Sequence, residues 1–257
     1  TGYDAIVVHG ASPRPVYLLV TEDGAELRDA SDLWGQDAVE VQGYLRRQLG
    51  ERGLKVAAIG PAGEKRVLIT SIINDEGRAA GRGGAGAVMG AKRLKAIALR
   101  GRRQVPLAQP GPFRQRVRQV LAALGRSPTS HALSRWGTPA NIDAAWITGD
   151  VPVQNWRRSR WKEGQSKITS QKLAELVAQR YGACLYCPIK CSRWVKLEKE
   201  GLHLDGPGPE YQTLATFGPL LLNDNLEVVL AANDLCNRYG LDTLSAGAAI
   251  AFAMEAY

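Results

Sequence analysis

Three of the four cysteines in this 257-residue chain fall within one short stretch, Cys184-Leu-Tyr-Cys187-Pro-Ile-Lys-Cys191. The Cys-x2-Cys-x3-Cys spacing places three thiol groups on one tight turn, and the packing of a hydrophobic core gives no reason for such crowding. Thiolates bind soft metals, and an iron–sulfur cluster is held by four of them, three commonly from one compact run. The run therefore predicts a metal site. The remaining cysteine, Cys236, lies in a segment predicted to be helical.

A structural zinc site is the alternative for the same cysteines. Such sites usually combine two Cys-x2-Cys pairs, whereas this chain offers one pair and the additional Cys191. Pro188 directly after Cys187 is similar to ferredoxin loops, although the order of the spacings differs from the bacterial ferredoxin pattern. The spacing alone leaves both metals open.

The composition indicates a globular protein of a reducing compartment. Hydrophobic residues make up 45% of the chain, yet no run of 18 apolar residues occurs, so we expect no membrane span. Crowded cysteines argue against a disulfide scaffold and favour the cytoplasm. The chain starts without an initiator Met and stops within a predicted helix, so we expect it to be the middle of a longer protein.

The apolar pattern predicts an α+β fold with two domains. Short Val, Ile and Leu runs separated by Gly, Pro and Asp-Gly predict strands in the first part of the chain, at 5–8, 16–20, 25–28, 56–59 and 67–73. Helices are predicted at 38–49, 113–124, 171–181 and 225–239, with Asp242 as the N-cap of a further helix. Three prolines within 106–112 predict a linker. We therefore expect a β-rich domain at 1–104 and a mostly helical domain at 105–257.

A glycine-rich loop follows the last predicted strand and matches G-x-G-x-x-G as Gly81-Arg-Gly-Gly-Ala-Gly86. A nicotinamide-binding unit needs an acidic residue about 20 positions later, but none occurs between Glu76 and Asp143. The Gly-Lys-Ser/Thr order of a P-loop is absent as well. Glycines allow backbone N–H groups to approach an anion, and Arg78 and Arg82 can bind phosphate. The loop predicts a phosphate-bearing cofactor, with a structural turn as the alternative.

The net charge of +8 raises the question of a nucleic-acid partner. Trp156-Arg-Arg-Ser-Arg-Trp-Lys162 interleaves aromatic and cationic side chains, as single-strand-binding surfaces do. Such a stretch is more often a surface loop whose long side chains cover apolar surface, so we expect no nucleic-acid binding.

Several motifs, in the same order along the whole chain, resemble the tungsten-containing aldehyde:ferredoxin oxidoreductase family. They are Gly2–Val8, Asp29–Gly35, Arg78–Ile97, Cys184–Cys191, Gly208–Tyr211 and Gly240–Thr243. The resemblance covers all 257 residues and corresponds to the middle of the family's length. It favours an iron–sulfur cluster over zinc at the cysteine run.

The resemblance implies a tungsten-bispterin cofactor, with molybdenum in place of tungsten as an open alternative, and a Mg ion that bridges the pterin phosphates. The implied phosphate-binding loop comprises Arg78, Ala79, Arg82, Gly83, Gly84 and Gly86, with the Ala79 carbonyl as a Mg ligand. A second implied pterin contact comprises Asn237, Gly240, Leu241 and Asp242, in which Asn237 replaces an acidic residue of the family motif. Cys184, Cys187 and Cys191 would bind a [4Fe–4S] cluster, whose fourth cysteine lies outside this chain.

The chain departs from the family pattern near the metal. The family stretch Gly-Pro-Glu-Tyr-Glu ends in an acid suited to proton transfer, whereas this chain has Glu210-Tyr-Gln212. Because Gln212 cannot titrate, it cannot be a general base, and the catalytic acid or base stays unknown. We expect Glu210 to be structural. A Glu-x-x-His iron site of some members is missing at Ala231–Asp234.

The resemblance implies a cytoplasmic, anaerobic enzyme that oxidises an aldehyde to a carboxylic acid and passes electrons through the cluster to ferredoxin. A related tungsten-pterin enzyme with different chemistry, such as an aromatic acyl-CoA reductase subunit, is the alternative, and Gln212 is what favours it. The aldehyde, the electron acceptor and the homo- or hetero-oligomeric state stay open.

Overall fold

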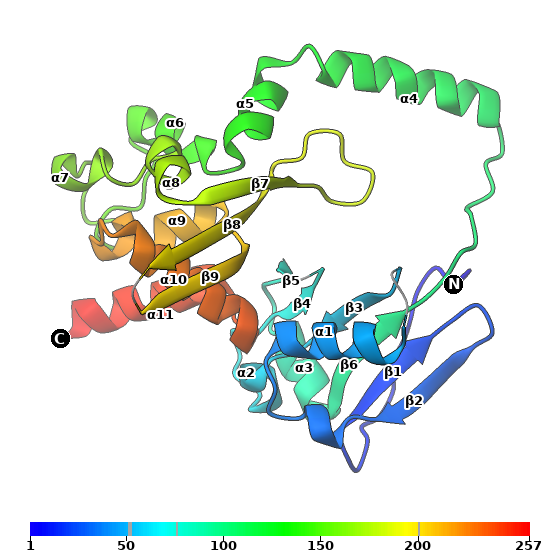
Figure 1. The fold of residues 1–257 in the computed structure, drawn as a ribbon. Helices are drawn as coiled ribbons and strands as arrows, with labels where there is room; N and C mark the ends of the chain where they lie inside the picture. The colour runs from blue at the N-terminus through cyan, green and yellow to red at the C-terminus, as the bar shows by residue number, and fades with distance from the viewer. Residues whose placement is uncertain (51–52, 76, 200) are drawn as a thin grey trace. The chain divides into compact units, whose positions relative to one another are not determined.

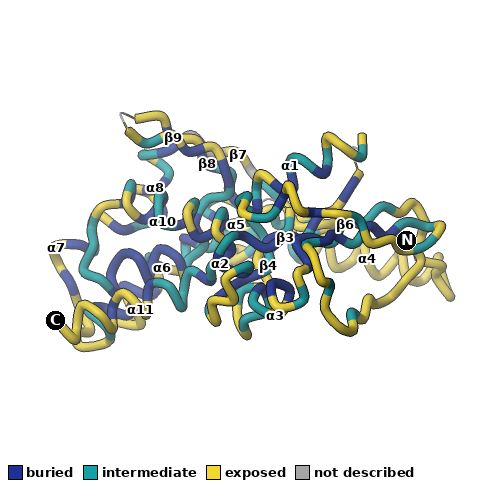
Figure 2. The backbone as a smooth tube through the Cα atoms, turned by 90° about the horizontal axis from the view of Figure 1, so that it is seen from below, coloured by how far each residue is buried: buried dark blue, intermediate teal, exposed yellow. Residues whose placement is uncertain are grey.

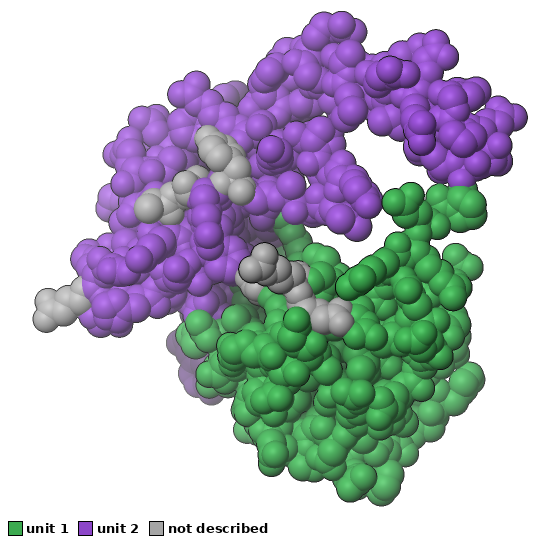
Figure 3. Space-filling view, turned by 45° about the vertical axis from the view of Figure 1, so that its right-hand side comes forward, with its two compact units in different colours: residues 1–106, 235–246 green, residues 107–234, 247–257 purple. Residues whose placement is uncertain are grey.

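The computed structural model describes residues 1–50, 53–75, 77–199 and 201–257. The chain forms two compact units, drawn in separate colours in Figure 3. Unit 1 comprises Thr1–Pro106 and Leu235–Ala246, and unit 2 comprises Leu107–Asp234 and Gly247–Tyr257. Helices and two sheets share the chain, so the α+β class is confirmed. The domain division at residue 104 stays a prediction.

Unit 1 is built on a six-stranded sheet with the order β2-β1-β6-β3-β4-β5 (Figure 1). Strands β1 and β6 are parallel, and the other neighbouring strands are antiparallel. The strands are β1 Val16–Val20, β2 Ala25–Asp29, β3 Lys55–Ala58, β4 Ile72–Asn74, β5 Arg78–Ala80 and β6 Leu94–Leu99. The helices are η1 Ser31–Leu33, α1 Ala38–Gln48, α2 Pro61–Glu64 and α3 Ala85–Ala91.

Local sequence signals account for the first hairpin and for α1. The amide of Thr21 donates to the carbonyl of Gly24 at 2.8 Å, which closes the predicted turn between β1 and β2. Asp37 accepts hydrogen bonds from the amides of Val39 and Glu40, each at 2.8 Å, and so caps the start of α1. Beyond its end Gly50 adopts a φ of 64°, as a helix terminator in the left-handed region does.

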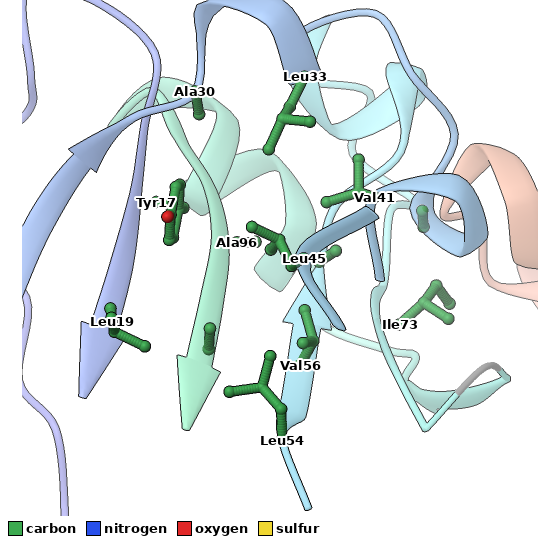
Figure 4. Close-up of a cluster of buried hydrophobic side chains, with 13 residues drawn as sticks. Tyr17, Leu19, Ala30, Leu33, Val41, Leu45, Leu54, Val56, Ile73 and Ala96 are labelled. Carbon is green, nitrogen blue, oxygen red and sulfur yellow. The ribbon is translucent and has the colours of Figure 1, made fainter. Parts of the chain in front are cut away.

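The main core of unit 1 lies between α1 and one face of the sheet (Figure 4). Val41 and Leu45 on α1 are buried against Val56 and Ile73 of the sheet. At about 25 cal/mol per Å² of buried apolar surface, each such side chain contributes about 1.5–3 kcal/mol. This packing fixes the sheet whose β4–β5 edge precedes the glycine-rich loop.

One predicted strand of unit 1 is wrong, and another is only partly right. Residues 5–8 form no strand, and Ile6 and Val7 are exposed. Of the predicted strand 67–73, only Ile72 and Ile73 belong to β4, because the preceding residues pair instead with a distant segment of the chain: Thr70 forms a β-bridge with Leu241.

A buried ion pair connects three segments of unit 1. The ammonium of Lys95 on β6 is fully buried and contacts the carboxylate of Glu64, and it donates to the carbonyl of Gln36 at 2.7 Å. Glu64 in turn accepts from the amide of Gly35 at 2.9 Å. Burial lowers the pKa of Lys95, and the hydrogen bond and charge of Glu64 act in the opposite direction. The pair therefore fixes residues 35–36 and α2 to the sheet.

Removing the cation alone would leave a buried carboxylate without its countercharge. We expect Lys95→Met to lower the free energy of unfolding by about 3–5 kcal/mol, measured by urea denaturation. Lys55→Met is the matched control, because the Lys55–Asp75 pair is 2.9 Å long but more than two-fifths exposed at both side chains, and its loss should cost about 1 kcal/mol or less. Equal effects of the two substitutions would contradict the role of Lys95.

Unit 2 combines helices with a three-stranded antiparallel sheet of the order β7-β8-β9 (Figure 1). The strands are β7 Ala178–Gly182, β8 Ser192–Lys199 and β9 Leu202–Pro207. The helices are α4 Pro110–Leu124, α5 Pro128–Trp136, α6 Ala140–Thr148, α7 Lys162–Gln165, α8 Ser170–Leu176, α9 Tyr211–Phe217 and η2 Pro219–Leu221. Helices α10 Leu226–Tyr239 and α11 Thr243–Ala256 contribute to both units. Helix α4 is exposed along its length (Figure 2).

The predicted helix at 171–181 is only half right. Thr169 caps α8 by accepting from the amide of Lys172 at 3.1 Å, as expected, but the helix ends at Leu176. Residues 178–182 form β7, which pairs along its whole length with β8. Hydrogen bonding to β8 outweighs the helical preference of residues 178–182. The sequence of this segment alone does not reveal its partner strand. The predicted helix at 225–239 is confirmed as α10.

None of the helices in the described part of the chain has the length and apolar character needed to cross a membrane.

Candidate functional site

The glycine-rich loop connects the edge strand β5 to α3 in unit 1. Arg78 opens β5 opposite Asn74, and its Nη2 atom is buried, whereas Arg82 is exposed. Gly83 and Gly84 adopt φ values of 90° and 69°, in the left-handed region that favours glycine. Glycine is therefore required by the backbone turn itself at these two positions.

The glycines of this loop have different neighbours. A Cβ atom on Gly84 would lie 2.8 Å from the carbonyl oxygen of Leu68, and one on Gly86 would lie 2.6 Å from that of Ser71. Gly83 instead has open space where its side chain would be. Packing thus explains Gly84 and Gly86, while Gly83 presents unobstructed backbone on the side where an anion could approach.

A second predicted site segment, at the end of α10, folds against this loop within unit 1. Gly240 has a φ of 73° and ends α10, and its carbonyl accepts from the amide of Ser71 at 2.8 Å. Asp242 donates its amide to the carbonyl of Ile69 at 2.9 Å. These antiparallel bonds hold residues 240–242 along residues 69–71.

The two segments converge at Gly81 and Asp242. The Oδ1 atom of Asp242 would lie 3.3 Å from a Cβ atom on Gly81, and the hydroxyl of Ser71 donates to the carbonyl of Gly81 at 3.2 Å. The other oxygen of Asp242, Oδ2, accepts from the amide of Ser245 at 3.0 Å and so caps α11, as predicted. Oδ1 therefore faces the loop while Oδ2 holds the helix.

Cys236 lies just before this segment on α10 and is buried. Burial, and secondarily the charge of Asp242, raise the pKa of its thiol to about 11. A thiol with such a pKa is protonated near neutral pH when no metal is bound.

The close approach at Gly86 yields a stability test. We expect Gly86→Ala to lower the free energy of unfolding by about 1–3 kcal/mol, because the added methyl group overlaps backbone that cannot move freely. Gly53→Ala is the control, since Gly53 has open space around it. Thermal denaturation of both variants measures the effect, and a Gly86→Ala variant as stable as the control would refute the packing.

The predicted cysteine ligands lie in unit 2, in the loop between β7 and β8. All three cysteines are thiols outside any disulfide, with Cys184 exposed and Cys187 and Cys191 half-buried. The amide of Cys187 donates to the carbonyl of Cys184 at 3.0 Å, which closes the tight turn expected from the spacing. Among residues 1–50, 53–75, 77–199 and 201–257, no three His, Cys, Asp or Glu side chains are gathered to hold a metal ion. The donors suit a cluster chemically, but their sulfur atoms are not assembled.

The predicted stretch Gly208–Gln212 also lies in unit 2, between β9 and the start of α9. The hydroxyl of Thr138 donates to the carboxylate of Glu210 and accepts from the amide of Tyr211 at 3.1 Å. Burial, and secondarily the charge of Asp150, raise the pKa of Tyr211. Gln212 is exposed on the first turn of α9. Glu210 thus connects the start of α9 to Thr138, and the side-chain amide of Gln212 is exposed.

The predicted site residues therefore form two sets. Unit 1 brings the loop at 78–86 together with residues 237–242, and unit 2 holds the cysteine loop and Gly208–Gln212. Thr138 and Ser71 were missed by sequence reasoning, because an isolated hydroxyl residue carries no motif. The available sequence signal was Gly137, directly before Thr138, because a glycine often follows the last residue of a helix. In the structure Gly137 follows α5 with a φ of 72°.

Comparisons with known proteins show which proteins this chain is similar to. The family model described as "Aldehyde ferredoxin oxidoreductase, N-terminal domain" matches residues 1–101, and "Aldehyde ferredoxin oxidoreductase, domains 2 & 3" matches residues 115–257. The tungsten-containing aldehyde ferredoxin oxidoreductases of Pyrococcus furiosus and Thermococcus kodakarensis are each 38% identical over 257 residues. The alignments cover 100% of this chain and 42% of each relative, so the chain spans about two-fifths of their length.

Two further proteins carry different names. The "Aliphatic sulfonate oxidoreductase, WOR-like subunit" of Pyrococcus furiosus is 27% identical over 272 residues, which cover 100% of this chain and 43% of that protein. A solved structure, the active site complex BamBC of benzoyl coenzyme A reductase with 1,5-dienoyl-CoA, matches with a TM-score of 0.80 and 33% identity. That match covers 96% of this chain and 38% of the other chain.

Proposed function

The chain belongs to the aldehyde ferredoxin oxidoreductase family, and from this premise we propose that it forms part of a tungsten-bispterin enzyme that oxidises aldehydes to carboxylic acids. The single observation that carries the proposal is the convergence of the Arg78–Gly86 loop with Asp242 in unit 1. A loop that presents open backbone and arginines, next to a buried carboxylate, suits a ligand with phosphate at one end and amines at the other.

The loop would bind and orient the pterin phosphates. Arg78 and Arg82 supply positive charge, and the open backbone at Gly83 allows a phosphate oxygen to approach closely. Several phosphate charges cannot be brought together without such neutralisation, because an uncompensated buried ion costs several kcal/mol. The family resemblance gives the Ala79 carbonyl as a candidate Mg ligand. It gives Gly84 and Gly86 as parts of the cofactor-binding loop.

The segment at 237–242 would hold the amine-bearing end of a pterin. Asp242 is 5% exposed and Asn237 is 8% exposed, so both could act on a ligand away from bulk water. Because Oδ2 of Asp242 caps α11, Oδ1 is the oxygen suited to accept a hydrogen bond from the ligand. Asn237 replaces an acidic residue of the family motif and offers a neutral hydrogen bond in place of an ionic one, beside Gly240 and Leu241.

Cys184, Cys187 and Cys191 would supply three thiolates to a [4Fe–4S] cluster. Their position on one loop with a closed turn supports this, and the family resemblance places the fourth cysteine ligand outside this chain. When bound, the tungsten pterin supplies the two-electron chemistry, while the protein provides binding, orientation and electrostatics. We propose that the electrons leave through the cluster to a ferredoxin-type carrier in an anaerobic cytoplasm.

Gln212 supports a second candidate function. It can orient a substrate or a water molecule but cannot accept a proton, which leaves the general base of an aldehyde oxidation unassigned. The likeness to the benzoyl coenzyme A reductase complex favours a relative with other chemistry on the same cofactor, such as an aromatic acyl-CoA reductase subunit. That complex contains more than one kind of subunit by its title, so a hetero-oligomer accompanies this alternative.

The functional test uses the full-length protein purified without oxygen. We expect tungsten and pterin in stoichiometric amounts, an absorption band from iron and sulfide, and reduction of a viologen dye by at least one aldehyde of a panel. Reduction of an aromatic acyl-CoA without any aldehyde activity would favour the second candidate. A protein that holds zinc and neither pterin nor iron would refute both.

The cysteine assignment has its own test in the same protein. We expect Cys187→Ser to reduce iron and sulfide content to background while pterin content stays near the wild-type value, because the two sets of ligands lie in different units. Cys236→Ala is the control and should retain iron, since Cys236 lies on α10 in unit 1 and outside the Cys184–Cys191 run of unit 2. Wild-type iron in the Cys187→Ser variant would contradict the assignment.

A further inference from the structure

Arg193 is a buried cation directly after the cysteine loop. It lies on β8, two positions beyond Cys191, and only 4% of its surface is exposed. Its guanidinium donates through Nη1 to the carbonyls of Lys190 at 2.9 Å and Ser192 at 3.0 Å. Both acceptors flank Cys191, so these bonds fix the backbone on either side of the third cysteine.

The same guanidinium also reaches the end of α5. Its Nη2 atom donates to the carbonyl of Ser134 and approaches the carbonyl of Leu133 at 3.5 Å. The last carbonyls of a helix lack partners within the helix, and an arginine near that end can satisfy them. Arg193 therefore connects the cysteine loop to α5, which lies more than fifty residues earlier in the chain.

Gly137 shows how closely the two segments pack. A Cβ atom on Gly137 would lie 2.8 Å from the carbonyl oxygen of Cys191 and 3.4 Å from Cγ of Arg193. The backbone of Cys191 thus lies directly against the residue that ends α5. Contact with a helix end limits the movement of Cys191 independently of the hydrogen bonds of Arg193.

The backbone of Arg193 extends this connection to the stretch near the proposed substrate. Its carbonyl accepts from the amide of Gly208 at 2.7 Å, and Gly208 begins the Gly208–Gln212 stretch. Thr138, next to Gly137, contacts Glu210 and Tyr211 of that stretch. The turn after α5 and Arg193 together contact both predicted site segments of unit 2.

We propose that Arg193 is a positioning residue. It holds the backbone of Cys191 against the end of α5 and so keeps the thiolate of Cys191 at the position from which it would bind the cluster. The ligand role of Cys191 rests on the proposed function, whereas the fixing of its backbone does not. Arginine suits this place because its planar fork carries five N–H donors in fixed directions, which a lysine ammonium cannot reproduce.

The test compares hydrogen exchange in full-length wild-type, Arg193→Lys and Arg180→Lys proteins by mass spectrometry. We expect Arg193→Lys to speed exchange about tenfold in two peptides, one covering 187–193 and one covering 133–138, which corresponds to about 1.4 kcal/mol of lost protection. Arg180→Lys is the control, since Arg180 is exposed on the neighbouring strand and stacks on Trp194 at 4.8 Å. It should leave both peptides unchanged.

Unchanged exchange in both peptides of Arg193→Lys would overturn the proposal, as would an equal increase over β8 and β9, which would indicate general unfolding. If Arg193→Lys does not fold, Gly137→Ala tests the same contact from α5 and should speed exchange at 187–193. Iron content separates the cluster assignment from the positioning role of Arg193. A wild-type protein without iron refutes the cluster, while the exchange data still decide whether Arg193 fixes the loop.

Discussion

The antiparallel backbone pairing between residues 69–71 and residues 240–242 is the constraint on which the candidate site depends. The amide of Ser71 bonds to the carbonyl of Gly240, and the amide of Asp242 bonds to that of Ile69, so a segment from the end of α10 becomes part of unit 1. Gly60 allows the approach, because a Cβ atom there would lie 2.3 Å from the backbone of Tyr239. Without this pairing, the glycine-rich loop would lack its neighbouring carboxylate.

Elements with strong local signals could be predicted from the sequence. The β1–β2 turn, the capped start of α1 and the glycine that ends α10 each depend on residues within a few positions of one another. Elements that depend on distant partners could not be predicted. Residues 178–182 pair with β8 and do not extend α8. Residues 67–71 do not join β4, and Thr70 pairs instead with Leu241 of the segment at 240–242. Both outcomes follow from tertiary pairing that no single segment records.

The candidate site shows the same division. The sequence identified the arginine–glycine loop and the segment at 237–242 separately, and its motifs identified the family. It did not show that Gly81 and Asp242 meet, or that one oxygen of Asp242 caps a helix while the other faces the loop. Arg193 and Thr138 had no motif, because their role comes from carbonyls and a carboxylate that are remote in sequence. Positioning residues of this kind are found only once the fold is known.

We propose that the glycine-rich loop, the buried carboxylate of Asp242 and the cysteine loop serve one redox function, with the organic cofactor bound at the loop and Asp242. The most direct test is an experimental structure of the full-length protein purified with its cofactors. We expect phosphate oxygens within hydrogen-bond distance of backbone amides at 81–84, and Oδ1 of Asp242 directed at a nitrogen of the same ligand. A pterin bound elsewhere, with the loop at 78–86 in contact with solvent alone, would contradict this proposal.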